Sequence, residues 1–291
     1  MSHASKDMTE GYLTLAVGRE NYLRMCINLA ISIKINDPKR RTCLAVGKSL
    51  LNEAILTEID SVFDDRIEIE ETNLEGVEYK MNSYKYSPYT RTMFVDGDVL
   101  LAKKDIDAIW DKLRGSPFSF VGKKTTSGFW RVNIDNIIST LGIEFVAEGN
   151  CGVYYFEKSE MSQKVFISMR ELFSNHKEII TTIHHGKGYS IEPIFGSACG
   201  IHNIEPFPQK TRKGLQWHFT TIKGSDFNLD VRRGVCSFLK GGVEVSPTFI
   251  HFPGLNLSGK SHVDHVYAKA VADMIGRDTV PDISDRVEPK L

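Results

Sequence analysis

Two carboxylates lie two residues apart in Asp96-Gly97-Asp98, with apolar residues on both sides. Side chains at positions i and i+2 of an extended segment point the same way, so Asp96 and Asp98 can reach one cation. Gly97 between them permits a bend and lets a ligand approach the backbone. Carboxylate oxygens suit Mg²⁺ or Mn²⁺, which then bind substrate phosphates. Asp-Gly is also a common turn, but the flanking apolar residues favour a metal site.

The elements before this pair must place it at the end of a strand. Apolar runs and helical spacing predict strands at 12–17, 42–46, 66–70 and 92–95, and helices at 21–34 and 50–63. This alternation predicts an α/β fold with a mostly parallel central sheet that helices flank. In such open sheets ligands bind at the C-terminal ends of the strands, which is where the acidic pair lies.

The second half of the chain is less regular. Its pattern predicts strands at 118–121, 150–156 and 248–252, and helices at 104–113, 159–173 and 262–275. Neither an internal repeat nor a linker-like composition break divides it. We therefore expect one domain over residues 11–276, a flexible N-terminus at 1–10 and a loosely held tail at 277–291.

Composition narrows the class of protein. The 291 residues carry 36 Lys+Arg and 37 Asp+Glu, and 41% are hydrophobic, which is ordinary for a globular protein that buries a core. No apolar run could span a bilayer and the first ten residues lack an apolar signal core, so we expect a cytoplasmic protein without a membrane partner. Five scattered cysteines argue against a disulfide framework and a structural zinc site.

Charge is balanced overall but not locally. Residues 208–240 contain seven bases and two acids, whereas residues 53–78 contain ten acids and one base. Two solvated faces explain this pattern most simply. The alternative is that the basic segment meets an anionic partner such as phosphate or nucleic acid.

Around the acidic pair the chain resembles glycosyltransferases of the GT-A fold, closest in pattern to the glycogenin-like enzymes of family 8. The resemblance runs from Tyr12 to about His262. It implies a donor half at about 11–125 and an acceptor half at about 126–276. In that family a Lys stands sixteen residues before the first Asp, as Lys80 does here. Lys80 would then meet the donor diphosphate or sugar; without the resemblance it would be a surface lysine on a helix.

The same resemblance assigns the segment after the first predicted strand to the nucleoside. Ala16, Gly18, Arg19 and Tyr22 occupy that place, although the family usually has Thr-Asn where this chain has Gly18-Arg19. Tyr22 would stack on uracil, because an aromatic face is a good platform for a base. Its alternative is an ordinary aromatic residue at a helix start.

Three later segments match family motifs. Asn150 and Gly152 would line the sugar pocket, and Cys151 between these two residues is read as a buried structural thiol. Gly97 would contribute to the donor site. Glu192 could orient an acceptor hydroxyl or the donor sugar, or simply begin a helix. His251 would be the third metal ligand, and Gly254 matches the same motif. Lys260 would contact the diphosphate, although it stands three residues after the position at which the family has its lysine. A lone His on an apolar strand is otherwise usually a core residue.

The resemblance implies a metal-dependent, retaining hexosyl- or pentosyltransferase that uses Mn²⁺ or Mg²⁺ and a nucleotide-diphosphate sugar, most simply a UDP-sugar. Asp96, Asp98, Glu192 and Lys260 would carry the catalysis. The acceptor would be a hydroxyl of a glycan or of a hydroxymethylated DNA base. The alternatives are a sugar-1-phosphate nucleotidyltransferase and a non-catalytic nucleotide-sugar-binding protein. The pairs His184-His185 and His262 with His265 lack carboxylate or cysteine partners at metal-binding spacing and are read as structural.

Overall fold

The computed structural model describes residues 9–72, 74, 76–182, 189–208 and 219–276. The predicted N-terminal arm up to residue 8, the tail at 277–291, the His184-His185 pair and three bases of the basic segment (Lys210, Arg212 and Lys213) lie outside these residues. None of the helices within the described ranges is both long and apolar enough to cross a membrane.

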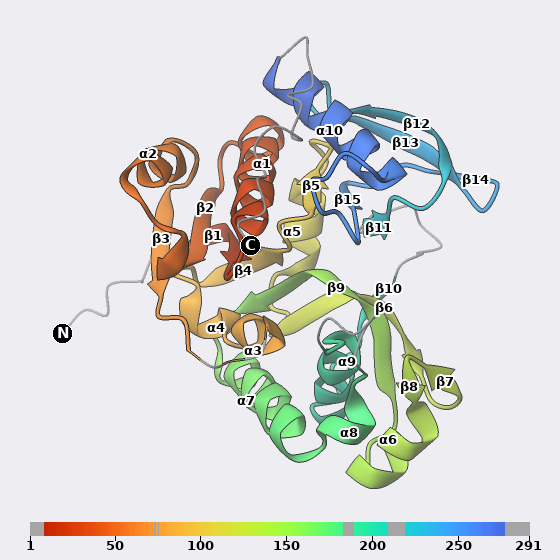
Figure 1. The fold of residues 1–291 in the computed structure, drawn as a ribbon. Helices are drawn as coiled ribbons and strands as arrows, with labels where there is room; N and C mark the ends of the chain where they lie inside the picture. The colour runs from red at the N-terminus through yellow and green to blue at the C-terminus, as the bar shows by residue number, and fades with distance from the viewer. Residues whose placement is uncertain (1–8, 73, 75, 183–188, 209–218, 277–291) are drawn as a thin grey trace.

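A seven-stranded sheet forms the centre of the described part (Figure 1). Its strands lie in the order β10 (Phe207–Pro208), β6 (Phe118–Thr125), β9 (Val146–Glu157), β4 (Arg91–Val95), β1 (Glu10–Ala16), β2 (Arg41–Gly47) and β3 (Asp65–Ile69). β9 runs antiparallel to both of its neighbours, and the other four pairs are parallel. The predicted mostly parallel sheet is therefore confirmed.

Helices cover both faces of this sheet. Consecutive side chains of a strand point to opposite faces, and in these strands both sets are apolar. Tyr12 packs with α1, whereas Leu13 packs on the face that holds α7. One face carries α1 (Glu20–Asn36), α2 (Glu53–Val62) and α5 (Asp107–Leu113). The other carries α3 (Gly76–Met81), α4 (Ser83–Tyr86), α6 (Ile134–Leu141), α7 (Glu160–Asn175), α8 (Lys177–Ile180) and α9 (Glu192–Ile201).

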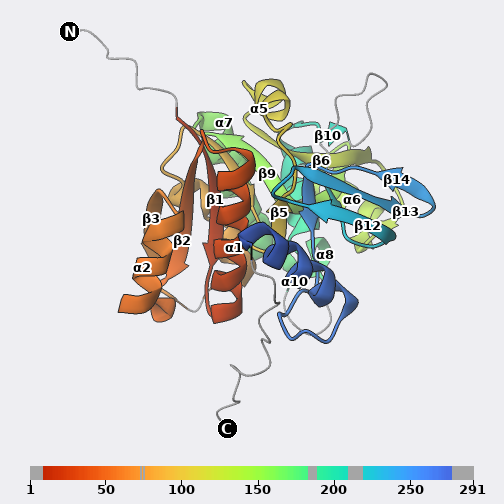
Figure 2. The ribbon, with the colours of Figure 1, turned by 90° about the horizontal axis from the view of Figure 1, so that it is seen from above.

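A smaller unit packs beside the end of the main sheet (Figure 2). It contains a sheet of β11 (Phe219–Thr221), β15 (Phe249–His251) and β5 (Val99–Leu101), and a second sheet of β12 (Ser225–Asp230), β13 (Val235–Lys240) and β14 (Val243–Val245). α10 (His262–Ile275) covers it, and Tyr267 of this helix packs edge-on against Phe252. The hairpin of β7 (Phe129–Trp130) and β8 (Val132–Asn133) pairs with none of these three sheets.

Local chemistry moves several element boundaries from their predicted positions. The helix expected from residue 50 begins at Glu53, because the Asn52 side chain accepts the Ile55 N–H as an N-cap and a short 3₁₀ turn at Lys48–Leu50 precedes it. The strand expected from residue 150 begins at Val146, because the longer β6 provides pairing partners for the added residues.

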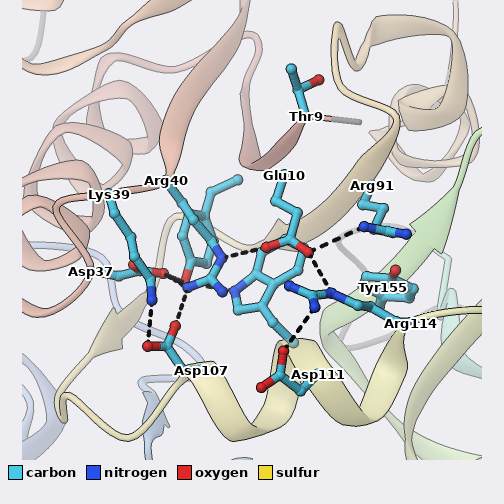
Figure 3. Close-up of polar contacts among 12 residues, drawn as sticks. Thr9, Glu10, Asp37, Lys39, Arg40, Arg91, Asp107, Asp111, Arg114 and Tyr155 are labelled. Carbon is cyan, nitrogen blue, oxygen red and sulfur yellow. Dashed lines mark hydrogen bonds and ion pairs between the residues drawn. The ribbon is translucent and has the colours of Figure 1, made fainter. Parts of the chain in front are cut away.

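An ion-pair network lies at the start of β1, where the chain enters the sheet (Figure 3). The Arg40 guanidinium is 3.0 Å from Glu10, 2.8 Å from Asp37 and 2.7 Å from Asp107, and its side chain is 6% exposed. It also lies 4.8 Å above the ring of Trp110, with Asp37 itself 1% exposed. Arg40 thus neutralises a carboxylate that water cannot solvate.

Replacement of this arginine should destabilise the fold. Arg40→Met leaves the buried Asp37 carboxylate without its cation, which costs about 3–5 kcal/mol of unfolding free energy. Urea unfolding measures this loss. Lys39→Met is the matched control, since the Lys39–Asp107 pair is more than half exposed on both sides and should contribute less than about 1 kcal/mol. Equal effects of the two variants would contradict the account.

The same network should make the fold sensitive to acid. Burial raises the pKa of Glu10, but hydrogen bonds from Arg114 and Arg40 outweigh it and hold the pKa below its usual value. The contribution of Glu10 is therefore complete above the ordinary glutamate pKa of about 4.3 and is lost as the pH falls through the lower folded value. In urea unfolding from pH 7 downward, wild type should lose more stability than Glu10→Gln. Parallel pH profiles would show that Glu10 contributes nothing.

Candidate active site

Three potential metal ligands from distant parts of the sequence converge at the end of β4. One ligand atom from each of Asp96, Asp98 and His251 can be chosen so that all lie within 4.8 Å of one another. The His251 Nε2 atom is 3.2 Å from Asp98 Oδ1. β5 begins directly after the acidic pair and runs antiparallel to β15, which sets Val99 opposite His251. The pairing of β5 with β15 is therefore what brings the imidazole to the carboxylates.

Backbone hydrogen bonds hold the acidic turn from two sides. The Asp96 N–H donates to the Gly152 carbonyl of β9 at 2.8 Å, and the Phe252 N–H donates to the Asp98 carbonyl at 2.8 Å. Within the turn, the Val99 N–H donates to the Asp96 carbonyl at 3.1 Å. The carboxylates consequently project from a segment that both sheets fix in place.

Gly97 is required by close packing beneath this turn. Its φ lies outside the left-handed region, so backbone conformation does not demand glycine. A Cβ at this position would lie 2.8 Å from the Cys26 Sγ and 3.3 Å from the Met25 Cβ, both on α1. The glycine thus lets α1 pack directly against the acidic turn, and the approach of a ligand to this backbone stays a prediction.

The electrostatics of the group favour a bound cation. Burial raises the pKa of Asp96 and the charge of Asp98 adds to this, although Lys80 and His251 act in the opposite direction. Burial also disfavours protonation of His251, but the Asp98 carboxylate outweighs it and raises the His251 pKa. Two carboxylates held together in a partly buried place repel each other, and a cation between them relieves that repulsion.

These residues fit a divalent metal ion. Two carboxylates and one imidazole form a donor set that suits Mn²⁺ and also accepts Mg²⁺. His251 is 6% exposed and turns Nε2 toward the carboxylates, while its buried Nδ1 has no hydrogen-bond partner among the described residues. The contact of Nε2 with Asp98 would also fit a buried core histidine, so the role of His251 as a metal ligand stays a prediction.

Lys80 lies in the same group, and its contact with a donor stays a prediction. Its ammonium is 2.8 Å from the Asp96 carboxylate, and its side chain is 12% exposed. It extends from α3 over the stacked rings of Phe94 and Tyr154, at 5.2 and 5.8 Å from their centres. Lys80 is on a helix but is not a solvated surface lysine.

The segment predicted to hold the nucleoside forms the exposed edge after β1. Gly18 has a φ of 81°, and its N–H donates to Glu71, which also accepts the Ser49 N–H. Tyr22 is 45% exposed, and the Arg19 guanidinium lies 6.0 Å from the centre of its ring. Ala16 is buried at the end of β1. The exposed Tyr22 ring is free to stack on a base, but its role stays a prediction.

Asn150 and Gly152 lie on β9 near the metal group. The Asn150 Oδ1 accepts the Gly152 N–H at 2.8 Å. A Cβ on Gly152 would lie 3.2 Å from the His251 Cε1 and 3.0 Å from the Phe219 ring. Cys151 is buried and burial raises its pKa well above the usual range, which agrees with a structural thiol.

Glu192 begins α9 and is held by a residue that the sequence analysis missed. The Arg131 Nη2 atom is 3.0 Å from the Glu192 Oε1, and Ser190 donates to the Glu192 Oε2 at 2.9 Å. Arg131 also donates to the Ser190 hydroxyl at 3.0 Å and has a φ of 56°, which is uncommon for a residue with a Cβ. No sequence pattern indicates this pairing, because it depends on how the β7–β8 hairpin packs.

Gly254 and Lys260 lie in the loop after β15. Gly254 has a φ of 84°, and the Asn256 carbonyl accepts the Asn21 side chain at 2.9 Å, which ties this loop to the start of α1. Lys260 is exposed, and its ammonium makes no hydrogen bond or ion pair with any described residue. The predicted contact of Lys260 with a diphosphate therefore stays a prediction.

The remaining described histidine pair is separate from the metal group, as expected. The His262 ring packs against Phe227, and the His265 Nδ1 atom lies 2.9 Å from the Ser261 carbonyl. Ser261 caps α10 in a reciprocal arrangement with Asp264.

Comparison with known proteins identifies the fold. No protein-family model matches the chain, and no curated protein matches it. Among solved structures, the galactosyltransferase LgtC in complex with donor and acceptor sugar analogs has a TM-score of 0.57 at 12% identity, covering 93% of this chain and 98% of that one. A second LgtC structure, of an active-site mutant, has a TM-score of 0.58 at 12% identity, with the same coverage. The bifunctional glycosyltransferase WbbM has a TM-score of 0.54 at 13% identity, covering 92% of this chain and 50% of that one. The chain therefore has the fold of GT-A-type glycosyltransferases.

The packing under the acidic turn gives a direct test of how the site is held. Gly97→Ala should cost about 1–3 kcal/mol of unfolding free energy, because the added methyl group meets the Cys26 Sγ. In the Cys26→Ala background the same change should cost less, because that sulfur is gone. Urea unfolding of the four proteins in this double-mutant cycle measures the coupling. An identical cost in both backgrounds would mean that Cys26 is not what restricts position 97.

Proposed function

We propose that the chain is a metal-dependent glycosyltransferase that transfers a sugar from a nucleotide-diphosphate donor, most simply a UDP-sugar, to a hydroxyl acceptor. The observation that carries the proposal is the group of Asp96, Asp98 and His251 at the C-terminal end of β4, with Lys80 beside it. This is the edge of an α/β sheet where ligands bind. The likeness of the fold to glycosyltransferases supports the same conclusion.

Asp96, Asp98 and His251 would hold Mn²⁺ or Mg²⁺. An ion bound there acts as a Lewis acid toward diphosphate oxygens. Lys80 adds a fixed positive charge that needs no reorganisation when the diphosphate leaves, since it already lies 2.8 Å from Asp96. Lys260 would supply a second cation from the loop after β15.

The remaining donor contacts are assigned by position. Tyr22 would stack on the base, with Ala16, Gly18 and Arg19 around it. Asn150 and Gly152 would border the sugar, and Gly97 and Gly254 the diphosphate. Placing donor and acceptor together supplies much of the catalysis in such a reaction, because the bound hydroxyl no longer has to find the anomeric carbon by diffusion.

Glu192 would orient an acceptor hydroxyl or the donor sugar. Arg131 and Ser190 fix the direction of its carboxylate. We name no nucleophile, and we propose retention of configuration and membership of family 8 on the basis of the sequence motifs alone.

Loss of one ligand carboxylate tests this proposal. Asp98→Ala should lower Mn²⁺-dependent release of UDP from UDP-sugars by at least about 100-fold, because loss of even an outer partner of a metal ligand costs 10–100-fold. Donor hydrolysis is assayed with and without Mn²⁺ over a panel of nucleotide sugars. Asp111→Ala is the control, since Asp111 is 64% exposed on α5. The circular dichroism spectra of both variants should match wild type.

Three results would contradict the proposal. Unchanged turnover in Asp98→Ala would remove the metal assignment. Release of pyrophosphate from a nucleoside triphosphate and a sugar 1-phosphate would instead identify a nucleotidyltransferase. Binding of a nucleotide sugar without any turnover, over the full range of acceptors tried, would identify a binding protein.

A further inference from the structure

A cavity of about 660 Å³ lies next to the metal group. Of the residues given a role above, only Asn150 lines it. β6 and β9 of the main sheet form one wall, and β11 with the end of β13 forms the other. Its volume is typical of sites for small molecules, which hold about 300–1,000 Å³. Trp130 provides an aromatic part of its lining.

One residue joins this cavity to the metal group. Phe219 lines the cavity, and its ring stacks on His251 with centres 5.6 Å apart and planes 18° from parallel. β11 also pairs with β15 so that Thr221 lies opposite His251. A molecule in the cavity would therefore be separated from the metal group by the thickness of one side chain.

One cation of the cavity lining is held by neutral groups alone among the described residues. Lys240 lines the cavity, and its ammonium donates to the Thr220 Oγ1 at 2.6 Å, the Thr221 Oγ1 at 2.9 Å and the Thr221 carbonyl at 3.0 Å. No described carboxylate pairs with Lys240. The other two lysines of the lining are paired, Lys123 with Glu148 at 3.1 Å and Lys124 with Glu205 at 2.5 Å.

The two threonine hydroxyls become donors as a result. Each oxygen accepts a hydrogen bond from Lys240, so each hydroxyl hydrogen is directed elsewhere, and it has no other partner among the described residues. Thr220 and Thr221 both line the cavity. A positive charge and two hydroxyl donors thus face the same space, which is the arrangement that binds an oxygen anion.

The charge on Lys240 is stabilised less than that of an ordinary lysine. Burial lowers its pKa, and the nearby exposed Lys223 lowers it further. An anion in the cavity would offset both effects by providing the missing opposite charge.

We propose that this cavity binds the acceptor, and that the acceptor is a small molecule with a phosphate or carboxylate group, to which the Thr220 and Thr221 hydroxyls donate while Lys240 supplies the positive charge. This rests on the proposed transferase function and names its substrate class. Nucleic acid fits less well, because binding its phosphates requires several unpaired cations in a row. Lys123 and Lys124, the other two lysines of the cavity, are paired with carboxylates.

The experiment measures binding to the full chain by isothermal titration calorimetry, with glucose, glucose 6-phosphate and glucuronate as probes. At least one of the two anionic probes should bind about tenfold more tightly than glucose or better. The two anions separate a phosphate-binding site from a carboxylate-binding site. Lys240→Met should abolish the preference for anions, and Lys240→Arg should retain part of it. Lys223→Met, which removes the same charge from the nearby surface, should leave it intact.

Lys80→Met serves as a second control, because an anion held at the metal group would depend on Lys80 rather than Lys240. Equal affinity for glucose and both anions, or an anion preference that survives Lys240→Met, would overturn the inference. So would a DNA duplex whose binding depends on Lys240 when that of the small anions does not.

Titration of UDP with Mn²⁺ into the same protein separates this inference from the proposed function. If UDP binds and the anionic probes show no dependence on Lys240, the cavity assignment alone is wrong. If the probes bind through Lys240 but UDP does not bind, the transferase proposal fails and the cavity is not an acceptor site.

Discussion

The repulsion between two carboxylates held side by side is the constraint around which this molecule is organised. Asp96 and Asp98 follow a buried strand in a turn that backbone hydrogen bonds hold from two sides, which keeps the two residues beside each other. Lys80 and His251 reach the pair from a helix before it and a strand far after it. The sheet of β11, β15 and β5 lies at this edge because β5 continues from the acidic turn and pairs with β15, which carries the histidine.

The first half of the fold follows from the sequence because its signals are local. Short apolar runs and helical spacing predict β1, α1, β2, α2, β3 and β4 to within a few residues. In the second half the same signals predict α5, β6, β9, α7, β15 and α10 to within a few residues, but other elements there could not be predicted in this way. β9 is antiparallel within a mostly parallel sheet, and β11 is three residues long, so partners distant in sequence decide both of them rather than periodicity. α9 contains two glycines and a proline, which conceal its helical pattern.

Some residues of the candidate site could likewise be predicted from the sequence, and others could not. The spacing of Asp96 and Asp98 indicates a cation site without any fold, and motif resemblance adds Lys80 and His251, which the structure brings together with them. Arg131 and Lys240 could not be found, because their importance comes from what surrounds them: a fixed carboxylate in one case, and in the other a cavity where no described carboxylate pairs with the ammonium. Lys260 shows the converse, a residue that a motif assigns and whose ammonium no described contact holds.

The most direct measurement of the central claim is pulsed electron paramagnetic resonance of Mn²⁺ bound to the protein. The account predicts one Mn²⁺ per chain whose spectrum contains the nitrogen modulation of a coordinated imidazole, and it predicts that this modulation disappears in His251→Phe while weaker binding through Asp96 and Asp98 persists. A nitrogen signal that is absent from wild type, or that is unchanged in His251→Phe, would contradict it.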